Sequence, residues 1–559
     1  MSLRRFGAAI GLMVAVLFAP AAMADEQAPP QSLSARLAAL RESRFHQRWP
    51  SAALPELPAD VLLKELRERQ AVRQPWPLAL QAARLEADLG ESPEAAALLA
   101  AAAARSGLTE TARSALSRAA GAERLPLTDA ALAVAERLLV DGAPDAALAA
   151  LPALPVRLER RDRHRLAMIK ARAQFALGRP RDAAQALQSA EFDPLRLVGA
   201  SAAERLDAAV LQYDLGIALI RSGATARGHA LLERLGRSAS IGDEAEAQAL
   251  RDRANLGLAA EFLAAGQGAT ARALFERVAL EGPYSNRALL GMGWAALGPQ
   301  GDPQAGGLNL DSAGTRSTPK FVLRVMQRRR LIDCENYNRR ALAPTELCSR
   351  QPRFEQARVP DRVESLAEEA IAVWQELSAR EPRDPTVREA WGALGHAAAR
   401  AGLRGEAIAG YEAAAGHLET ALAANEDARR RVAAEGLAAG WAALPAEAEA
   451  SAVLAPGDSL PLATLIRFEA ALGVDAAPAS AARRRLLAEH LEARWLLAEY
   501  GEDPALAELL DAQRQALAAT VSESLDGERR QLAHWLASVR AGLATLSDPS
   551  FVLPPPSPP

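Results

Sequence analysis

The chain has 559 residues, of which half are apolar and only 4% aromatic, and its 65 basic and 69 acidic residues leave a net charge of −4. This balance excludes a general nucleic-acid-binding protein, which needs a clear basic surplus. Strong helix formers, led by alanine and leucine, fill most of the sequence, and alternating β-branched runs are rare. The composition therefore predicts an all-α protein.

Residues 1–24 have the pattern of a secretory signal peptide. Two arginines precede an apolar run from Phe6 to Ala19, and a small-x-small pattern ends at Ala24. The run is shorter than the about 20 residues of a typical membrane-spanning helix. We expect cleavage before Asp25, a periplasmic location and no transmembrane span in the mature chain. A retained membrane anchor is the alternative.

Residues 25–75 contain several prolines between two short helical stretches, at 32–49 and 59–73. We interpret this segment as an N-terminal helical cap, because the end of a repeat array must cover its apolar face.

From residue 76 to residue 297 one pattern recurs: an apolar helix, a glycine turn, and a second helix with an early alanine and a bulky residue four positions later. The pattern is clearest at 253–283, where Gly266 and Gly268 mark the turn and Pro283 stops the second helix. Because one hairpin cannot bury its apolar stripe alone, we expect neighbouring hairpins to stack around a continuous core. The pattern resumes over 361–443, and the other units span 76–105, 128–155, 164–194, 209–240 and 388–420.

These units resemble tetratricopeptide repeats, whose 34-residue pattern places Trp, Leu-Gly and Tyr before Ala, Phe, Ala and Pro. The likeness is best at 252–285 and 388–421, and successive units are about 34 to 50 residues apart. The resemblance implies an α-solenoid, and a more general stack of helical hairpins is the alternative. Six aromatic residues at helical spacing beside alanines are expected in the core: Phe262, Phe275, Trp294, Trp374, Trp391 and Tyr411.

Residues 298–360 interrupt one hairpin. Residues 284–297 have the pattern of a first helix, and residues 361–380 have the pattern of its second helix. An insertion of this length is uncommon and tends to be functional or disordered. Both cysteines of the chain, Cys334 and Cys348, lie in it, and in an oxidising compartment we expect them to form a disulfide. Free or intermolecular thiols are the alternative.

Residues 444–549 form a predicted C-terminal helical region, which is either a cap or a partner-binding bundle. Its helices are expected at 461–472, 479–500, 503–523 and 526–546. The Pro-rich tail, residues 550–559, is expected to be disordered.

No enzyme signature is present, because HExxH, GxSxG and P-loop patterns are missing from the sequence. We therefore predict no catalytic, cofactor-binding or metal-binding residues. The expected function is a non-enzymatic interaction scaffold of the bacterial cell envelope, which binds a protein or peptide on a concave face. The alternative is a cell-wall hydrolase with a helical superstructure.

Two sets of residues are candidates for partner binding. The resemblance places the first helix of each unit along the concave groove, where the matching exposed positions are Tyr213, Arg221, Arg253, His396 and Arg400. A basic cluster in the insertion is either a solvated face or a docking site for carboxylate or phosphate groups: Lys320, Arg324, Arg328, Arg329 and Arg330. The carboxylate clamp of the family is not expected, because its Lys and Asn positions hold other residues: Tyr213 and Ile217, Leu256 and Ala260, and Gly392 and His396.

Overall fold

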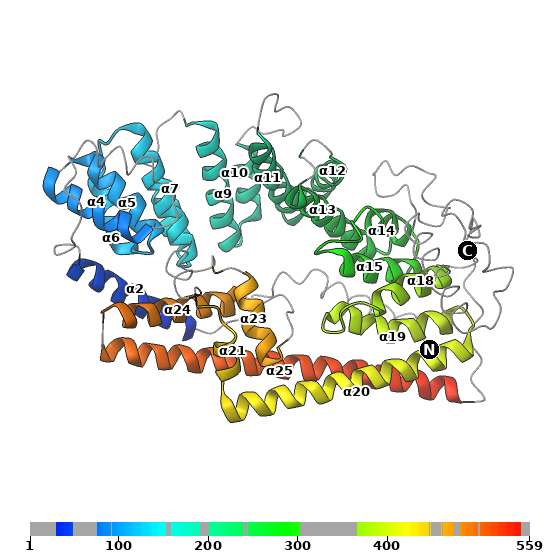
Figure 1. The fold of residues 1–559 in the computed structure, drawn as a ribbon. Helices are drawn as coiled ribbons and strands as arrows, with labels where there is room; N and C mark the ends of the chain where they lie inside the picture. The colour runs from blue at the N-terminus through cyan, green and yellow to red at the C-terminus, as the bar shows by residue number, and fades with distance from the viewer. Residues whose placement is uncertain are drawn as a thin grey trace, which may run out of the picture.

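The computed structural model describes residues 29–48, 75–90, 92–151, 158–189, 201–238, 241, 244–301, 366–446, 448, 460, 462–474, 481–500 and 503–548. Every regular element in these ranges is a helix (Figure 1), which confirms the all-α prediction for this part of the chain. None of the described helices combines the length and the apolar character that a membrane crossing requires. The predicted signal peptide, the helix at 59–73, the Pro-rich tail, the pair Cys334 and Cys348 and the basic cluster at 320–330 lie outside the described residues.

Helical hairpins follow one another along the first half of the molecule. Their helices are α4 (Pro75–Leu89), α5 (Pro93–Arg105), α6 (Thr109–Arg118), α7 (Arg124–Val140), α8 (Pro144–Ala149), α9 (Arg160–Ala176), α10 (Pro180–Gln188), α11 (Ala202–Arg221), α12 (Thr225–Gly236), α13 (Ala245–Ala264), α14 (Gly268–Phe275) and α15 (Ser285–Leu297). Each hairpin packs against the next one, and the first helices α7, α9, α11, α13 and α15 contact one another in that order. The architecture is therefore repeat-like.

Glycines with positive φ make the tight turns inside five hairpins. They adopt φ between 67° and 90°, a region that other residues rarely enter, and they are Gly90, Gly142, Gly178, Gly223 and Gly266. These are turn glycines of the predicted units. Gly268, which the sequence also assigned to a turn, instead begins α14. Its N–H donates to the carbonyl oxygen of Pro299 at 2.8 Å, so the chain that follows α15 caps α14.

Helix α15 packs against α18 (Leu366–Ser378), although residues 298–365 separate them in the sequence. Trp374 of α18 is fully buried, and its Nε1–H donates to the Leu290 carbonyl oxygen at 3.2 Å. Gly293 leaves room for the indole, since an added Cβ there would lie 2.3 Å from the ring. This is the pairing expected of one hairpin whose two helices are separated by an insertion. The next hairpin is α19 (Pro385–Arg400) with α20 (Arg404–Glu435).

The chain then returns beneath the hairpins (Figure 1). Its remaining helices are α21 (Ala438–Ala442), α23 (Leu462–Leu472), α24 (Ala481–Tyr500) and α25 (Pro504–Ser547). Helices α20 and α25 pack side by side. Because α25 is one helix of 44 residues, the prediction of two helices at 503–523 and 526–546 is wrong. The buried stripe of α25 continues across the expected break, from Leu525 to Leu532.

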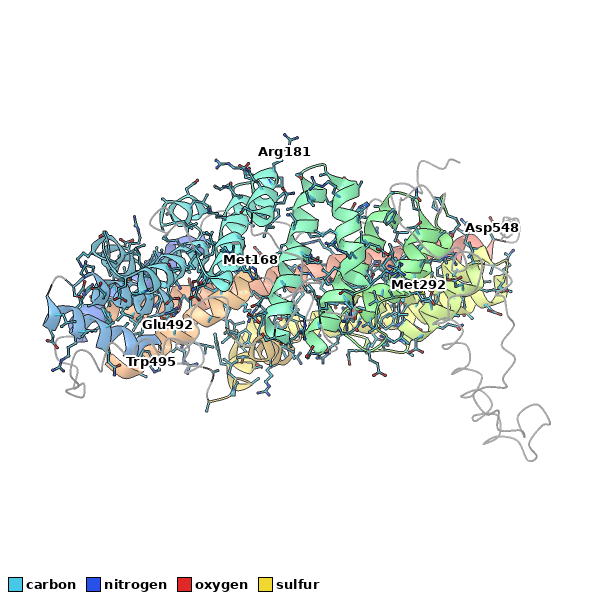
Figure 2. The ribbon with its side chains drawn as sticks, turned by 90° about the horizontal axis from the view of Figure 1, so that it is seen from above. Met168, Arg181, Met292, Glu492, Trp495 and Asp548 are labelled. Atoms are coloured by element: carbon cyan, nitrogen blue, oxygen red, sulfur yellow. The ribbon has the colours of Figure 1, made fainter. Side chains whose placement is uncertain are left out.

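Helix α2 (Pro29–Arg48) joins the first hairpins of the row to the C-terminal helices. It contacts α6 among the first hairpins, and it contacts α24 and α25 of the C-terminal region. Figure 2 shows Glu492 of α24 at the same end as the first hairpins, with Asp548 at the opposite end. The buried Arg41 donates from Nε and Nη2 to the Glu492 carboxylate at 2.6 and 2.7 Å, and from Nη1 to the Gly107 carbonyl oxygen at 2.7 Å. The N-terminal segment thus does more than cover one hairpin, because it ties the row to the returning helices.

Candidate partner-binding face

Aromatic and charged side chains from the first helices make the face that we call the first-helix face. Its described members are Arg172 (α9), Tyr213 and Asp214 (α11), Arg253 (α13), Trp294 (α15), and Glu389, His396 and Arg400 (α19). They form two groups, one around Arg253 and one around Trp294.

In the first group, Tyr213 is not an exposed groove residue as predicted, because it is only 9% exposed. The Arg253 guanidinium lies 4.7 Å from the centroid of its ring, which is within cation–π range. Burial raises the pKa of the Tyr213 phenol, and the charge of Arg253 opposes that rise. The pair therefore presents the exposed Arg253 to solvent rather than the tyrosine.

Asp214 connects this group to the neighbouring first helices. Burial raises the pKa of its carboxyl, while the charges of Arg172 and Arg253 act to lower it. Arginines on α9 and α13 thus flank an acid on α11. Arg221, another predicted residue, lies near the C-terminal end of α11, with its guanidinium 5.7 Å from the ring centroid of Phe175.

The second group is centred on Trp294, whose Nε1–H donates to Oε1 of Glu389 at 3.1 Å. The sequence placed Trp294 in the core, but it is partly exposed, whereas Phe262, Phe275, Trp374, Trp391 and Tyr411 are buried as predicted. The indole of Trp294 stands edge-to-face against the buried Trp374 at 4.9 Å, which fixes its orientation. His396 lies 6.1 Å from Trp294 between ring centroids, so the predicted histidine belongs to this group.

Two side chains of α19 have strongly shifted pKa values. Burial raises the pKa of the Glu389 carboxyl to about 7, and the hydrogen bond from Trp294 opposes the rise. Burial and the charge of Arg400 lower the pKa of His396 to about 4. At neutral pH the histidine is therefore uncharged, and Glu389 is the group that titrates.

Glu389 is expected to lower the stability of the fold as the pH rises. Below pH 4.5 its carboxyl is neutral in both the folded and the unfolded chain, so no penalty exists. Between pH 4.5 and about 7 only the unfolded chain ionises, and stability falls until the folded-state pKa is passed. Glu389→Gln should therefore unfold like the wild type at pH 4 and be up to about 3 kcal/mol more stable at pH 8. Guanidinium denaturation at both pH values measures this, and an equal difference at the two pH values would contradict it.

Sequence reasoning found only part of this face. It named Tyr213, Arg253, His396 and Arg400, and the structure brings them together in the two groups described above. It missed Glu389, although Glu389 and His396 are seven residues apart and seven residues is nearly two helical turns. The hydrogen-bond donor to Glu389 is Trp294 of α15, which lies on the other side of the insertion in the sequence. No local pattern indicates that contact.

A solvent-open cavity of about 610 Å³ lies elsewhere, between α2 and the helices α4, α5 and α6. Its polar side chains pair with one another, since Arg118 donates to Glu86 at 2.9 Å and a ring nitrogen of His46 lies 3.3 Å from Oγ1 of Thr111. We assign no ligand to it. Among the described residues there is also no cluster of three or more potential metal ligands.

The fold and the face define an all-α protein of stacked helical hairpins, with charged and aromatic side chains along its first helices. No model of a known protein family matches the chain, and no curated protein matches it. The residues themselves therefore carry the assignment of function.

Proposed function

We propose that this protein is a non-enzymatic interaction scaffold of the bacterial cell envelope, built from hairpins like those of tetratricopeptide repeats, and that it holds a peptide or protein on the first-helix face. The observation that carries the proposal is the Arg172–Asp214–Arg253 group, which spans α9, α11 and α13. Charges distributed over the first helices of three successive hairpins suit an extended partner better than a small molecule. The signal-peptide pattern of residues 1–24 supports the envelope location, and the basic cluster at 320–330 is a second proposed contact.

Removing the charges of this group should weaken capture of the partner. We expect Arg172→Ala together with Arg253→Ala to lower the affinity of the mature chain for its envelope partner by about tenfold or more, because interface arginines are frequent binding hot spots. Arg227→Ala is the matched control, since Arg227 is exposed on the second helix α12. The measurement is quantitative capture from solubilised envelope extract, followed by titration of the protein that is recovered.

Site-specific cross-linking gives an independent reading of the same face. A photoreactive residue at position 253 should form an adduct with the partner, and the same residue at position 227 should not. Equal adducts at both positions would exclude the first-helix face as the docking surface. Release of soluble fragments from purified peptidoglycan, and its loss in Glu389→Gln, would instead favour the hydrolase alternative.

A further inference from the structure

Several carboxylates at buried helix junctions of this protein are paired with arginines. Four pairs connect different helices, each with an N–O distance of 2.6 Å: Arg41–Glu492, Arg272–Glu369, Arg388–Glu528 and Arg483–Glu469. Such pairing is the expected solution, because a carboxylate withdrawn from water without a cation is strongly destabilising.

Glu389 differs from the carboxylates of these four pairs. Its hydrogen-bond partner is the neutral indole of Trp294, and among the described residues no cationic side chain forms an ion pair with it. Other charged or titratable groups lie on α19 itself and on the helices α15 and α25 that pack against it. On α19 they are His396 and Arg400, on α15 the exposed Arg287, and on α25 Glu528, which is paired with Arg388. Glu389 and Trp294 thus place a carboxyl group beside an aromatic ring, without the arginine that each of the four pairs contains.

We propose that Glu389 and Trp294 form a binding site for a cationic side chain, arginine or lysine, of the partner that lies on the first-helix face. This inference rests on the proposed function and specifies the chemistry of the partner. The carboxylate accepts hydrogen bonds from the cation, and the indole, held by Trp374, offers it an aromatic surface. A guanidinium fits both features, because it is planar and can pair with a carboxylate through two parallel hydrogen bonds.

The site also predicts how binding depends on pH. A cation favours the ionised carboxylate, whereas the empty site holds the proton up to about pH 7. Affinity should therefore rise with pH and level off above pH 7, with about 30-fold weaker binding at pH 5.5 than at pH 8. His396 does not contribute to this change, because its pKa of about 4 keeps it neutral over the whole range.

The test uses the whole mature chain and two small probes, the peptides acetyl-Ala-Arg-Ala-amide and acetyl-Ala-citrulline-Ala-amide, which differ in charge but hardly in shape. Calorimetric titration at pH 8 should detect the arginine peptide and not the citrulline peptide. Glu389→Gln should lower the affinity for the arginine peptide at least tenfold and remove the pH dependence of that affinity. The control Glu412→Gln changes an exposed acid on α20 and should have no effect.

Equal binding of the two peptides, or unchanged binding in Glu389→Gln, would overturn the site. Binding that appears only after Arg328, Arg329 and Arg330 are replaced by alanine would also overturn it, because the chain's own basic cluster would then be the occupant. Either result leaves capture through Arg172 and Arg253 as a separate measurement, so failure of this site and failure of the proposed function are distinguishable.

Discussion

Arg41→Met is expected to open the contact that α2 makes between the first hairpins and α24, and to destabilise the protein by about 3–5 kcal/mol. The substitution leaves the buried carboxylate of Glu492 without its cation, and it removes the donor to the Gly107 carbonyl oxygen. Hydrogen exchange is the direct measurement. Amides of α2 and α24 should exchange at least about a hundredfold faster, while those of α13 and α14, at the centre of the row, should change little.

Two further variants separate the loss of this pair from a general loss of charge. Arg36 lies on the same helix and pairs with Glu508 at 3.2 Å, but both side chains are exposed, so Arg36→Met should cost no more than about 1 kcal/mol. The double variant Arg41→Met with Glu492→Met replaces both charges by apolar groups and should recover most of the stability. If Arg36→Met were as damaging as Arg41→Met, burial would not be the source of the effect.

The sequence predicted those parts of the fold that depend on local chemistry. A turn glycine is visible because only glycine adopts positive φ readily, so the turns at Gly178 and Gly223 were placed correctly. The second-helix pattern around Trp374 was also visible, because it lies within one short segment. These signals need no knowledge of what lies across the molecule.

The parts that the sequence did not predict depend on distant partners. Arg41 and Glu492 are 451 positions apart, and in a chain with 65 basic and 69 acidic residues nothing local marks this pair. Helix α6 was not among the predicted units, and its N-terminus has no capping side chain of its own. Glu42 of α2 supplies the cap, accepting from the N–H groups of Glu110 and Thr111 at 2.9 and 3.3 Å.

Trp374→Ala is expected to cost about 3–5 kcal/mol, because it empties a fully buried site and removes the hydrogen bond to the Leu290 carbonyl oxygen. Gly291 and Gly293 of α15 have no side chains to refill the space. Guanidinium denaturation measures the loss, and faster hydrogen exchange confined to α14, α15 and α18 would locate it. The control Trp374→Phe keeps most of the apolar contact and should cost about 1–2 kcal/mol.

Trp374→Ala also tests which contacts stabilise the hairpin of α15 and α18. Closing a loop costs about 0.6 kcal/mol more each time its length doubles, so replacing a turn of about four residues by residues 298–365 costs about 2 kcal/mol, whereas halving the insertion changes this cost by only about 0.6 kcal/mol. Trp374, packed against α15, must then supply the stability together with the buried pair Arg272–Glu369 at 2.6 Å, which joins α18 to α14. Shortening the insertion by half should consequently leave the hydrogen-exchange rate of the α18 amides almost unchanged, whereas Trp374→Ala should increase that rate. The opposite ranking would mean that the inserted residues, and not the packed helices, maintain this junction.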